Sequence, residues 1–174
     1  MTLHALGQST EDAKLLLDAV ASKMEGYENM EIKFSQTLVN EDAGIYDGDE
    51  APIVGKIILQ QEKYNLEYLG NTFLFNGFTM YVGYTYTMGK VIQKNGRNLQ
   101  FVNLFPMDNT SNIIKVELVI DLKTKHIYQL IQTGENGSKT TFTITTFIPN
   151  QKLPEKIFSF DTQKYSEENG YTID

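Results

Sequence analysis

The spacing of hydrophobic residues changes at residue 30, and from there alternation dominates almost to the end of the chain. In the first such run, Met30, Ile32 and Phe34 alternate with charged and polar residues, which is typical of a β-strand with one dry face. Similar runs, joined by short polar or glycine-bearing links, predict further strands at 53–60, 63–69, 71–75, 78–82, 84–93, 97–104, 112–121, 126–133 and 139–148, with a closing strand at 171–173. Because tight links join consecutive strands, the sequence predicts antiparallel meanders and a mostly β fold.

One amphipathic helix is predicted ahead of these strands. Ser9 and Asp12 match a capping box at its start, and Gly26 offers a stop. Its apolar stripe consists of Ala13, Leu16, Leu17, Val20, Met24 and Tyr27, which recur at helical spacing. We therefore expect an α+β fold in which this helix covers part of the sheet.

The chain of 174 residues is of a size for one domain, and no linker or repeat divides it. We predict a single domain over 1–174, with 1–8 as a leader. Ala5-Leu6-Gly7 has the small-x-small shape of a signal-peptidase site, so these residues are read either as the tail of a trimmed export signal or as an artificial leader.

Charge and cysteine content exclude several classes of function. A net charge of −7, with Arg97 as the single arginine, argues against nucleic-acid binding, because that requires clustered cations to release counterions. The absence of cysteine removes disulfides, thiolate zinc sites and cysteine nucleophiles. It also argues against a membrane receptor anchored through a lipidated N-terminal cysteine.

The sequence offers little catalytic chemistry. It lacks G-x-S-x-G, and only His4 and His126 titrate near neutral pH; His126 is expected in an exposed or capping role just past a turn. The glycines at 134–137 are not followed by the residues of a phosphate-binding loop, and the acidic residues 40–50 lack EF-hand spacing and predict a solvated loop. We predict a non-enzyme without a metal site or cofactor.

Aromatic residues dominate what remains, as in KYNLEYLGNTFLFNGFTMYV at 63–82. The chain has ten tyrosines and ten phenylalanines, more bulky apolar surface than one helix covers. Such a sheet must curl, pair with a second sheet or hold a ligand, and burial of a fatty-acyl chain would contribute on the order of 10 kcal/mol gross. The alternative is a structural or protein-interaction domain whose aromatic faces are ordinary core.

The order of short motifs resembles the periplasmic outer-membrane lipoprotein carrier family, LolA and its relatives. The similar stretches are the helix followed by Phe34-Ser35-Gln36, Gly55 at the head of the next strand, the alternation of Tyr64, Leu66 and Tyr68, Asn76-Gly77 before Met80-Tyr81-Val82, and Phe158-Ser159-Phe160 before Gly170-Tyr171-Thr172-Ile173-Asp174. This resemblance extends over nearly the whole chain.

The resemblance implies an incomplete, strongly curved antiparallel β-barrel whose concave face is covered by the N-terminal helix and, in the family, by further helices. It implies a soluble, exported, monomeric periplasmic carrier that shelters lipoprotein acyl chains or other lipids in an apolar cavity and delivers them to the outer membrane. The implied partners are an inner-membrane lipoprotein-releasing transporter and an outer-membrane receptor.

One face of each strand is expected to line that cavity, and the helix is expected to act as its lid. The predicted lining residues are Ile32, Phe34, Ile57, Leu59, Leu66, Tyr68, Phe73, Phe75, Met80, Val82, Val116, Leu118 and Ile120. The predicted lid residues are Leu16, Leu17, Val20 and Met24.

The sequence departs from the family pattern in three places. Gln60-Gln61-Glu62-Lys63 stands where the family carries an arginine that helps to latch the lid, and tyrosine and phenylalanine replace its strand tryptophans. Between Val82 and Gly83 the family has a longer stretch with lid helices, which predicts a natural shortening or an omitted segment.

Overall fold

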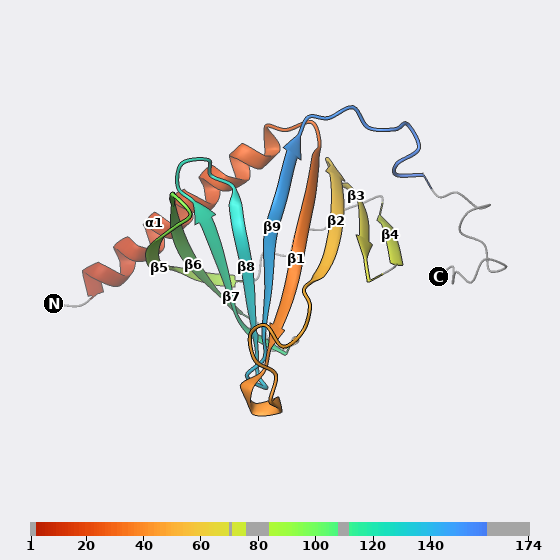
Figure 1. Cartoon of the computed structure of the whole chain (residues 1–174). Coiled ribbons are helices and arrows are strands. Elements are labelled where there is room, and N and C mark those ends of the chain that lie inside the picture. The colour runs from red at the N-terminus through yellow and green to blue at the C-terminus, as the bar shows by residue number, and fades with distance from the viewer. Residues whose placement is uncertain (1–2, 70, 76–83, 108–111, 160–174) are drawn as a thin grey trace.

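The computed structural model describes residues 3–69, 71–75, 84–107 and 112–159, with side chains described outside 3–8 and 71–75. The chain begins with a long helix and continues into strands (Figure 1). The elements are α1 (Leu3–Glu25), β1 (Met30–Val39), η1 (Glu41–Ala43), β2 (Ile53–Gln60), β3 (Lys63–Tyr68), β4 (Asn71–Phe75), β5 (Tyr84–Lys94), β6 (Arg97–Pro106), β7 (Ile113–Asp121), β8 (Ile127–Gly134) and β9 (Lys139–Pro149).

The strands form one antiparallel sheet in the order β4-β3-β2-β1-β9-β8-β7-β6-β5. The first and last of these strands along the chain meet in the middle, where β1 pairs with β9 from Met30↔Pro149 to Val39↔Lys139. Within the described residues β4 and β5 form opposite edges, so the sheet is not closed. The predicted α+β class, with an incomplete curved barrel and an N-terminal helix, is confirmed.

Most strand predictions agree with the structure to within a few residues, and the largest difference is at β1. This strand continues to Val39, beyond the predicted run at 30–35, because residues up to Val39 pair with β9. The predicted strand at 78–82, the closing strand at 171–173 and the junction between Val82 and Gly83 lie outside the described residues.

The start of the helix was predicted wrongly. Helix α1 begins at Leu3, so Ser9 lies within it and does not cap it. Residues 3–8 contain leucine, alanine and glutamine, which favour helix, and no proline stops the helix from extending toward the N-terminus. At the other end the helix stops before Gly26, whose N–H donates to the Ser22 carbonyl at 3.2 Å.

The main core lies between α1 and one face of β5–β7 (Figure 1). Ala13, Leu16 and Val20 from the helix pack against Val102 and Ile120, and each of these residues is at most 8% exposed. The spacing of the helical residues places them on one side of α1. A smaller cluster of Leu99, Phe101 and Val119 lies on the opposite face of the sheet.

The segment after β9 is attached to that opposite face near β1–β3. Asn29 and Gln151 exchange two hydrogen bonds, from Asn29 Nδ2 to the Gln151 carbonyl at 2.9 Å and from the Gln151 N–H to Asn29 Oδ1 at 3.1 Å. Asn65 Nδ2 donates to the Ile157 carbonyl at 2.8 Å. These contacts hold the segment after β9 against β3 and the start of β1.

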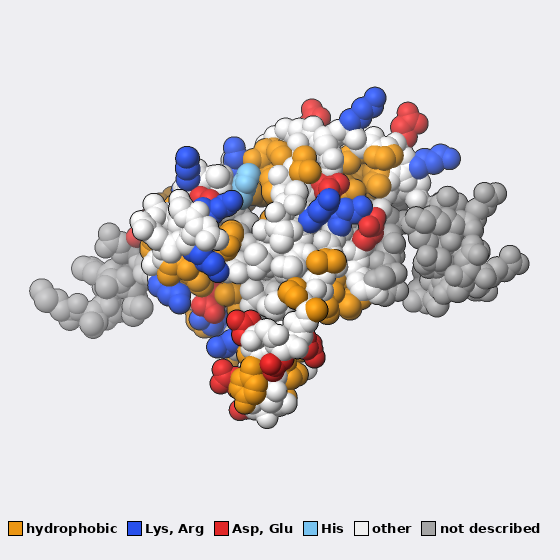
Figure 2. Space-filling model, in the orientation of Figure 1, with side chains coloured by type: hydrophobic (Ala, Val, Ile, Leu, Met, Phe, Trp, Pro, Cys, Tyr) orange, Lys and Arg blue, Asp and Glu red, His pale blue; other side chains and the backbone are white. Residues whose placement is uncertain are grey.

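The acidic loop between β1 and β2 projects from the end of the sheet at which β1 ends and β2 begins. Figure 2 shows carboxylate side chains gathered on this projection. Its residues are exposed apart from Asn40 and Ile45, and Asn40 caps the short helix η1 by accepting the Ala43 N–H at 3.1 Å. The prediction of a solvated loop at 40–50 is therefore confirmed.

Candidate functional site

Strand register places the predicted lining residues of β1, β2 and β3 on one face. Directly paired residues point to the same side of a sheet, and Ile32 pairs with Ile57, which pairs with Leu66. Phe34 pairs in the same way with Gly55, and Gly55 with Tyr68. These residues therefore form a continuous apolar surface across three strands.

The same face continues through the middle of the sheet to the helix. Gln36 pairs with Phe142, and Phe142 with Leu130. Leu130 pairs in turn with Leu118, and Leu118 with Val102, which packs against α1. The residues on β1–β3 thus share a face with the residues under the helix.

The structure divides the predicted lining residues into two groups. Val116 and Ile120, 5% and 0% exposed, are packed in the β6–β8 region, and Leu118 packs beside them against the helix core. Ile32, Phe34, Ile57, Leu59, Leu66 and Tyr68 are only partly buried. Phe73 and Phe75 lie on β4 opposite Leu66 and Tyr64, but their side chains lie outside the described part, as do Met80 and Val82 entirely.

The predicted lid residues all lie on the side of α1 that faces the sheet. Leu16 and Val20 are 8% and 6% exposed, and Leu17 and Met24 pack against the same core cluster. This cluster lies on β5–β7 and the first residue of β8, so the helix covers one half of the face and leaves the β1–β3 half partly exposed.

Aromatic rings form a row across the exposed half. The Phe34 ring lies between Tyr68 on β3 and Phe142 on β9, with ring centroids 5.8 Å apart in both pairs. A Cβ atom on Gly55 would lie 2.3 Å from Cζ of Phe34, so the ring lies directly over this glycine. Gly55 therefore provides the space in which the central ring of the row rests.

Sequence reasoning missed the contribution of β9. Phe142, Ile144 and Phe147 share the apolar face, but a register shift between Lys33 and Phe34 of β1 breaks the simple alternation of β9. Ile144 pairs with Phe34 and Phe147 with Ile32, so Thr145 is an extra residue between them. The two-residue spacing of Phe142 and Ile144 was the sequence signal that could have placed both residues on the apolar face.

His126 joins the helix end to the sheet. Its ring stacks on Phe147 with centroids 4.2 Å apart, and Nε2 lies 2.8 Å from the hydroxyl of Tyr27. Burial lowers the pKa of His126 below its usual 6.5, and the Lys23 ammonium lowers it further, while Asp121 opposes them. The expectation of an exposed or capping role is wrong, because the ring is partly buried between aromatic neighbours.

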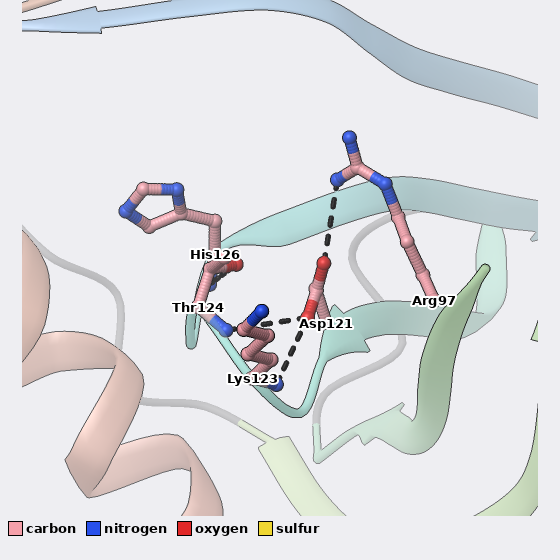
Figure 3. A network of polar contacts seen from close by, with 5 residues as sticks. All are labelled: Arg97, Asp121, Lys123, Thr124 and His126. Atoms are coloured by element: carbon pink, nitrogen blue, oxygen red, sulfur yellow. Dashed lines mark hydrogen bonds and ion pairs between the residues drawn. The ribbon is translucent and has the colours of Figure 1, made fainter. Parts of the chain in front are cut away.

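Asp121 organises the turn that precedes His126 (Figure 3). Its Oδ1 accepts the N–H groups of Lys123 and Thr124 at 2.9 and 3.2 Å, and Oδ2 pairs with Arg97 Nη1 at 3.3 Å. Asp121 as a whole residue is only 4% exposed, and these hydrogen-bond and ion-pair partners offset the lost hydration of its carboxylate. The hydrogen bonds of Asp121 therefore serve to stabilise the turn.

Described residues line several hollows in the surface, of which two are relevant here. One of about 380 Å³ is lined by Asn112, Ile113, Gln132, Gly134, Glu135, Asn136, Ser138 and Thr140. A smaller one of about 90 Å³ lies beside Arg97, His126 and Phe147. Across the described residues, no group of three or more histidine and carboxylate side chains is placed to hold a metal ion.

In the part of the chain that the structure describes, no helix has both the length and the apolarity needed to cross a membrane. No family profile matches the sequence, and no protein of curated function matches it.

Several solved structures are similar to this chain. MucB from Pseudomonas aeruginosa, in its complex with MucA, has a TM-score of 0.46 at 14% identity over 87% of this chain and 62% of that chain. A putative outer membrane lipoprotein-sorting protein domain from Vibrio parahaemolyticus has a TM-score of 0.47 at 10% identity, over 86% of this chain and 97% of that chain. The Mycobacterium tuberculosis lipoprotein LppX has a TM-score of 0.46 at 8% identity, over 84% of this chain and 99% of that chain.

The match spans less than two thirds of MucB. The solved structures that are similar to the chain include a putative outer membrane lipoprotein-sorting protein domain, and the resemblance in sequence is to the outer-membrane lipoprotein carrier family.

Proposed function

We propose that this protein is a periplasmic carrier that binds the acyl chains of lipoproteins, or of other lipids, on the helix-facing side of its sheet. One observation carries the proposal: the β1–β3 half of that face is apolar and partly exposed, whereas α1 packs on the β5–β7 half. A contiguous exposed apolar surface is unfavourable in water unless a ligand or partner covers it.

The free energy gained by burying an acyl chain on this surface is sufficient for lipid binding. Each methylene group that leaves water contributes about 0.8 kcal/mol, so a long acyl chain laid along this surface would gain on the order of 10 kcal/mol before the costs of ordering. The aromatic row of Tyr68, Phe34 and Phe142 offers flat contacts along such a chain.

In the proposed role, the helix is a lid over the β5–β7 half of this face and moves aside when acyl chains extend there from the β1–β3 half. The residues involved are those predicted from the sequence, Leu16, Leu17, Val20 and Met24, together with the lining residues on β1–β4 and β7. The proposal includes export to the periplasm, delivery to the outer membrane, and a transporter and receptor as partners, and it includes no catalytic step.

The test is displacement of a hydrophobic fluorescent probe. The folded wild-type protein should bind the probe and release it stoichiometrically to a synthetic diacylated lipopeptide. Leu66→Asp should abolish this binding with little loss of stability, because Leu66 is partly exposed on the apolar face.

Val54→Asp is the matched control. Val54 neighbours this surface on β2 but has the opposite strand parity from Ile57, and it is 74% exposed. The Val54→Asp variant should bind the probe as tightly as the wild-type protein does. Indifference of the wild-type protein to acylated competitors would instead favour a structural or protein-interaction domain.

A further inference from the structure

The apolar face changes to a polar one along β8 and β9. Leu130 pairs with Phe142, and two residues further along each strand Gln132 pairs with Thr140. Side chains two positions apart on a strand lie on the same face about 7 Å apart. The apolar pair and the polar pair are therefore neighbours on the face to which we assign acyl binding.

The polar pair opens into the hollow of about 380 Å³ at this end of the sheet. The turn between β8 and β9 supplies further polar groups, and Ser138 Oγ donates to Asn136 Oδ1 at 2.7 Å. A Cβ atom on Gly134 would lie 2.7 Å from Ser138 Oγ, so a side chain there would displace these groups. Glycine at this position therefore lets the turn fold closely over the strand end.

The charge in and around the hollow is negative. Glu135 lines it, and Asp42 Oδ2 approaches the turn at Gly137. The lysines in the adjoining strands, Lys115 and Lys139, have the opposite strand parity from Val116 and Thr140, and Lys115 pairs with Glu117 at 3.0 Å. The hollow therefore suits an uncharged or cationic group and disfavours a phosphate.

A buried acceptor without a donor lies next to this region. Oε1 of Gln36 is buried and has no hydrogen-bond partner in the structure. Gln36 pairs with Phe142, so its side chain shares the face and lies where the apolar and polar portions meet. Buried acceptors are rarely left unpaired, so this oxygen would gain a partner if the face opened to admit a hydrogen-bond donor.

We propose that this hollow binds the polar group of an acylated ligand and that the group is uncharged or cationic and rich in hydrogen-bond donors. Peptide amides of an acylated peptide and hydroxyl groups of a glycolipid share this chemistry. The acyl chains would lie beside it on Phe142, Phe34 and Leu130. The inference rests on the proposed function, because it assumes that acyl chains occupy the adjoining face.

The test compares lipids that carry the same two acyl chains and differ only in the polar group. The probes are a diacylglycerol, a diacylated dipeptide amide, a diacylglycerol galactoside and a phosphatidylglycerol. We expect the dipeptide amide or the galactoside to bind about tenfold more tightly than the diacylglycerol, and the phosphatidylglycerol to bind no more tightly. The comparison of amide with galactoside separates the two sources of donors.

The double variant Gln132→Leu and Thr140→Val should lose this preference and keep its affinity for the diacylglycerol. The matched control is Thr133→Val with Thr141→Val, on the same strands and the opposite face, which should keep the preference. Glu135→Lys should bind phosphatidylglycerol more tightly, because it reverses a charge that lines the hollow.

An unchanged preference in the Gln132 and Thr140 variant would overturn the inference, as would a wild-type preference for phosphatidylglycerol. In both cases the diacylglycerol still binds, so the proposed function stands. If the wild-type protein does not bind the diacylglycerol, the proposed function and the inference both fail.

Discussion

At the scale of single residues, Gly55 and Phe34 show how a missing side chain shapes the candidate site. The Phe34 ring occupies the space over Gly55, and from there it reaches both Tyr68 and Phe142. A methyl group on residue 55 would overlap the ring, which would have to leave the aromatic row. The order of the row therefore depends on a residue that contributes no side chain to it.

Gly55→Ala should lower the free energy of unfolding by about 1 to 3 kcal/mol, because the new Cβ atom displaces the ring. In a Phe34→Ala background the same substitution should cost much less, since the overlapping ring is gone. Urea unfolding followed by circular dichroism measures both effects. Gly26→Ala is the control, because a Cβ atom there would meet nothing closer than 3.5 Å. Equal costs of Gly55→Ala in both backgrounds would contradict the packing described.

His126 gives a pH-dependent contribution to stability. Its pKa in the folded protein is lowered by burial and by Lys23, whereas the unfolded chain has the usual value near 6.5. Between these values the unfolded chain binds more protons, so protonation favours unfolding. The stability associated with His126 is therefore present above pH 6.5 and is lost as the pH falls through the folded pKa.

Unfolding free energies measured between about pH 7.5 and pH 5.5 should fall toward the acid side in the wild type. His126→Phe keeps a ring against Phe147 and removes the titrating group, so it should flatten this slope. A slope that persists unchanged in His126→Phe would show that other groups cause it.

At the scale of elements, α1 is attached to the sheet through one stripe of residues. Ala13, Leu16 and Val20 are buried against Val102 and Ile120, while Leu15 on the outer side is 63% exposed. The helix therefore depends on tertiary packing, as expected for an amphipathic helix. The same stripe would have to separate from part of the sheet if the helix moves aside for a ligand.

Leu16→Ala should destabilise the protein by about 2 to 4 kcal/mol, since it leaves a cavity under the helix. Leu15→Ala changes the same residue type one position away and should stay within about 0.5 kcal/mol of the wild type. Chemical denaturation of the two variants measures the difference. Similar costs for both would mean that α1 is not packed through this side.

At the scale of the whole molecule, the β1–β9 pairing joins the two halves of the chain into one sheet. Without it the half with β2–β4 and the half with β5–β8 would be separate meanders. The pairing makes a single face, of which one half is covered by α1 and the other half is partly exposed. Ligand binding on the exposed half would therefore stabilise the whole fold.

A diacylated lipopeptide at about 100 times its Kd should raise the free energy of unfolding by about 2.7 kcal/mol, because it binds the folded state alone. Thermal unfolding with and without the lipopeptide measures the gain. The same peptide without acyl chains is the control and should have no effect. An unchanged midpoint with the acylated peptide would contradict acyl binding by the folded protein.

Much of the fold could be predicted from local patterns. The alternation around Met30, Ile32 and Phe34, and the glycine and asparagine turns, are signals carried by neighbouring residues, so strand positions followed from them. The parity of Ile57 and Leu66 was also readable, since the apolar members of each strand pattern point to one side. Whether these residues bind acyl chains stays a proposal.

Other features depend on contacts between residues distant in sequence, which local patterns do not contain. The extra residue at Thr145, which brings Phe147 to the same face as Phe142 and Ile144, arises only where β9 pairs with β1. The position of α1 over β5–β7, and the polar pair of Gln132 and Thr140 beside Phe142, likewise require the assembled sheet. Alternation along the chain thus sets which side chains share a face, whereas long-range pairing sets which strands adjoin and which part of that face the helix covers.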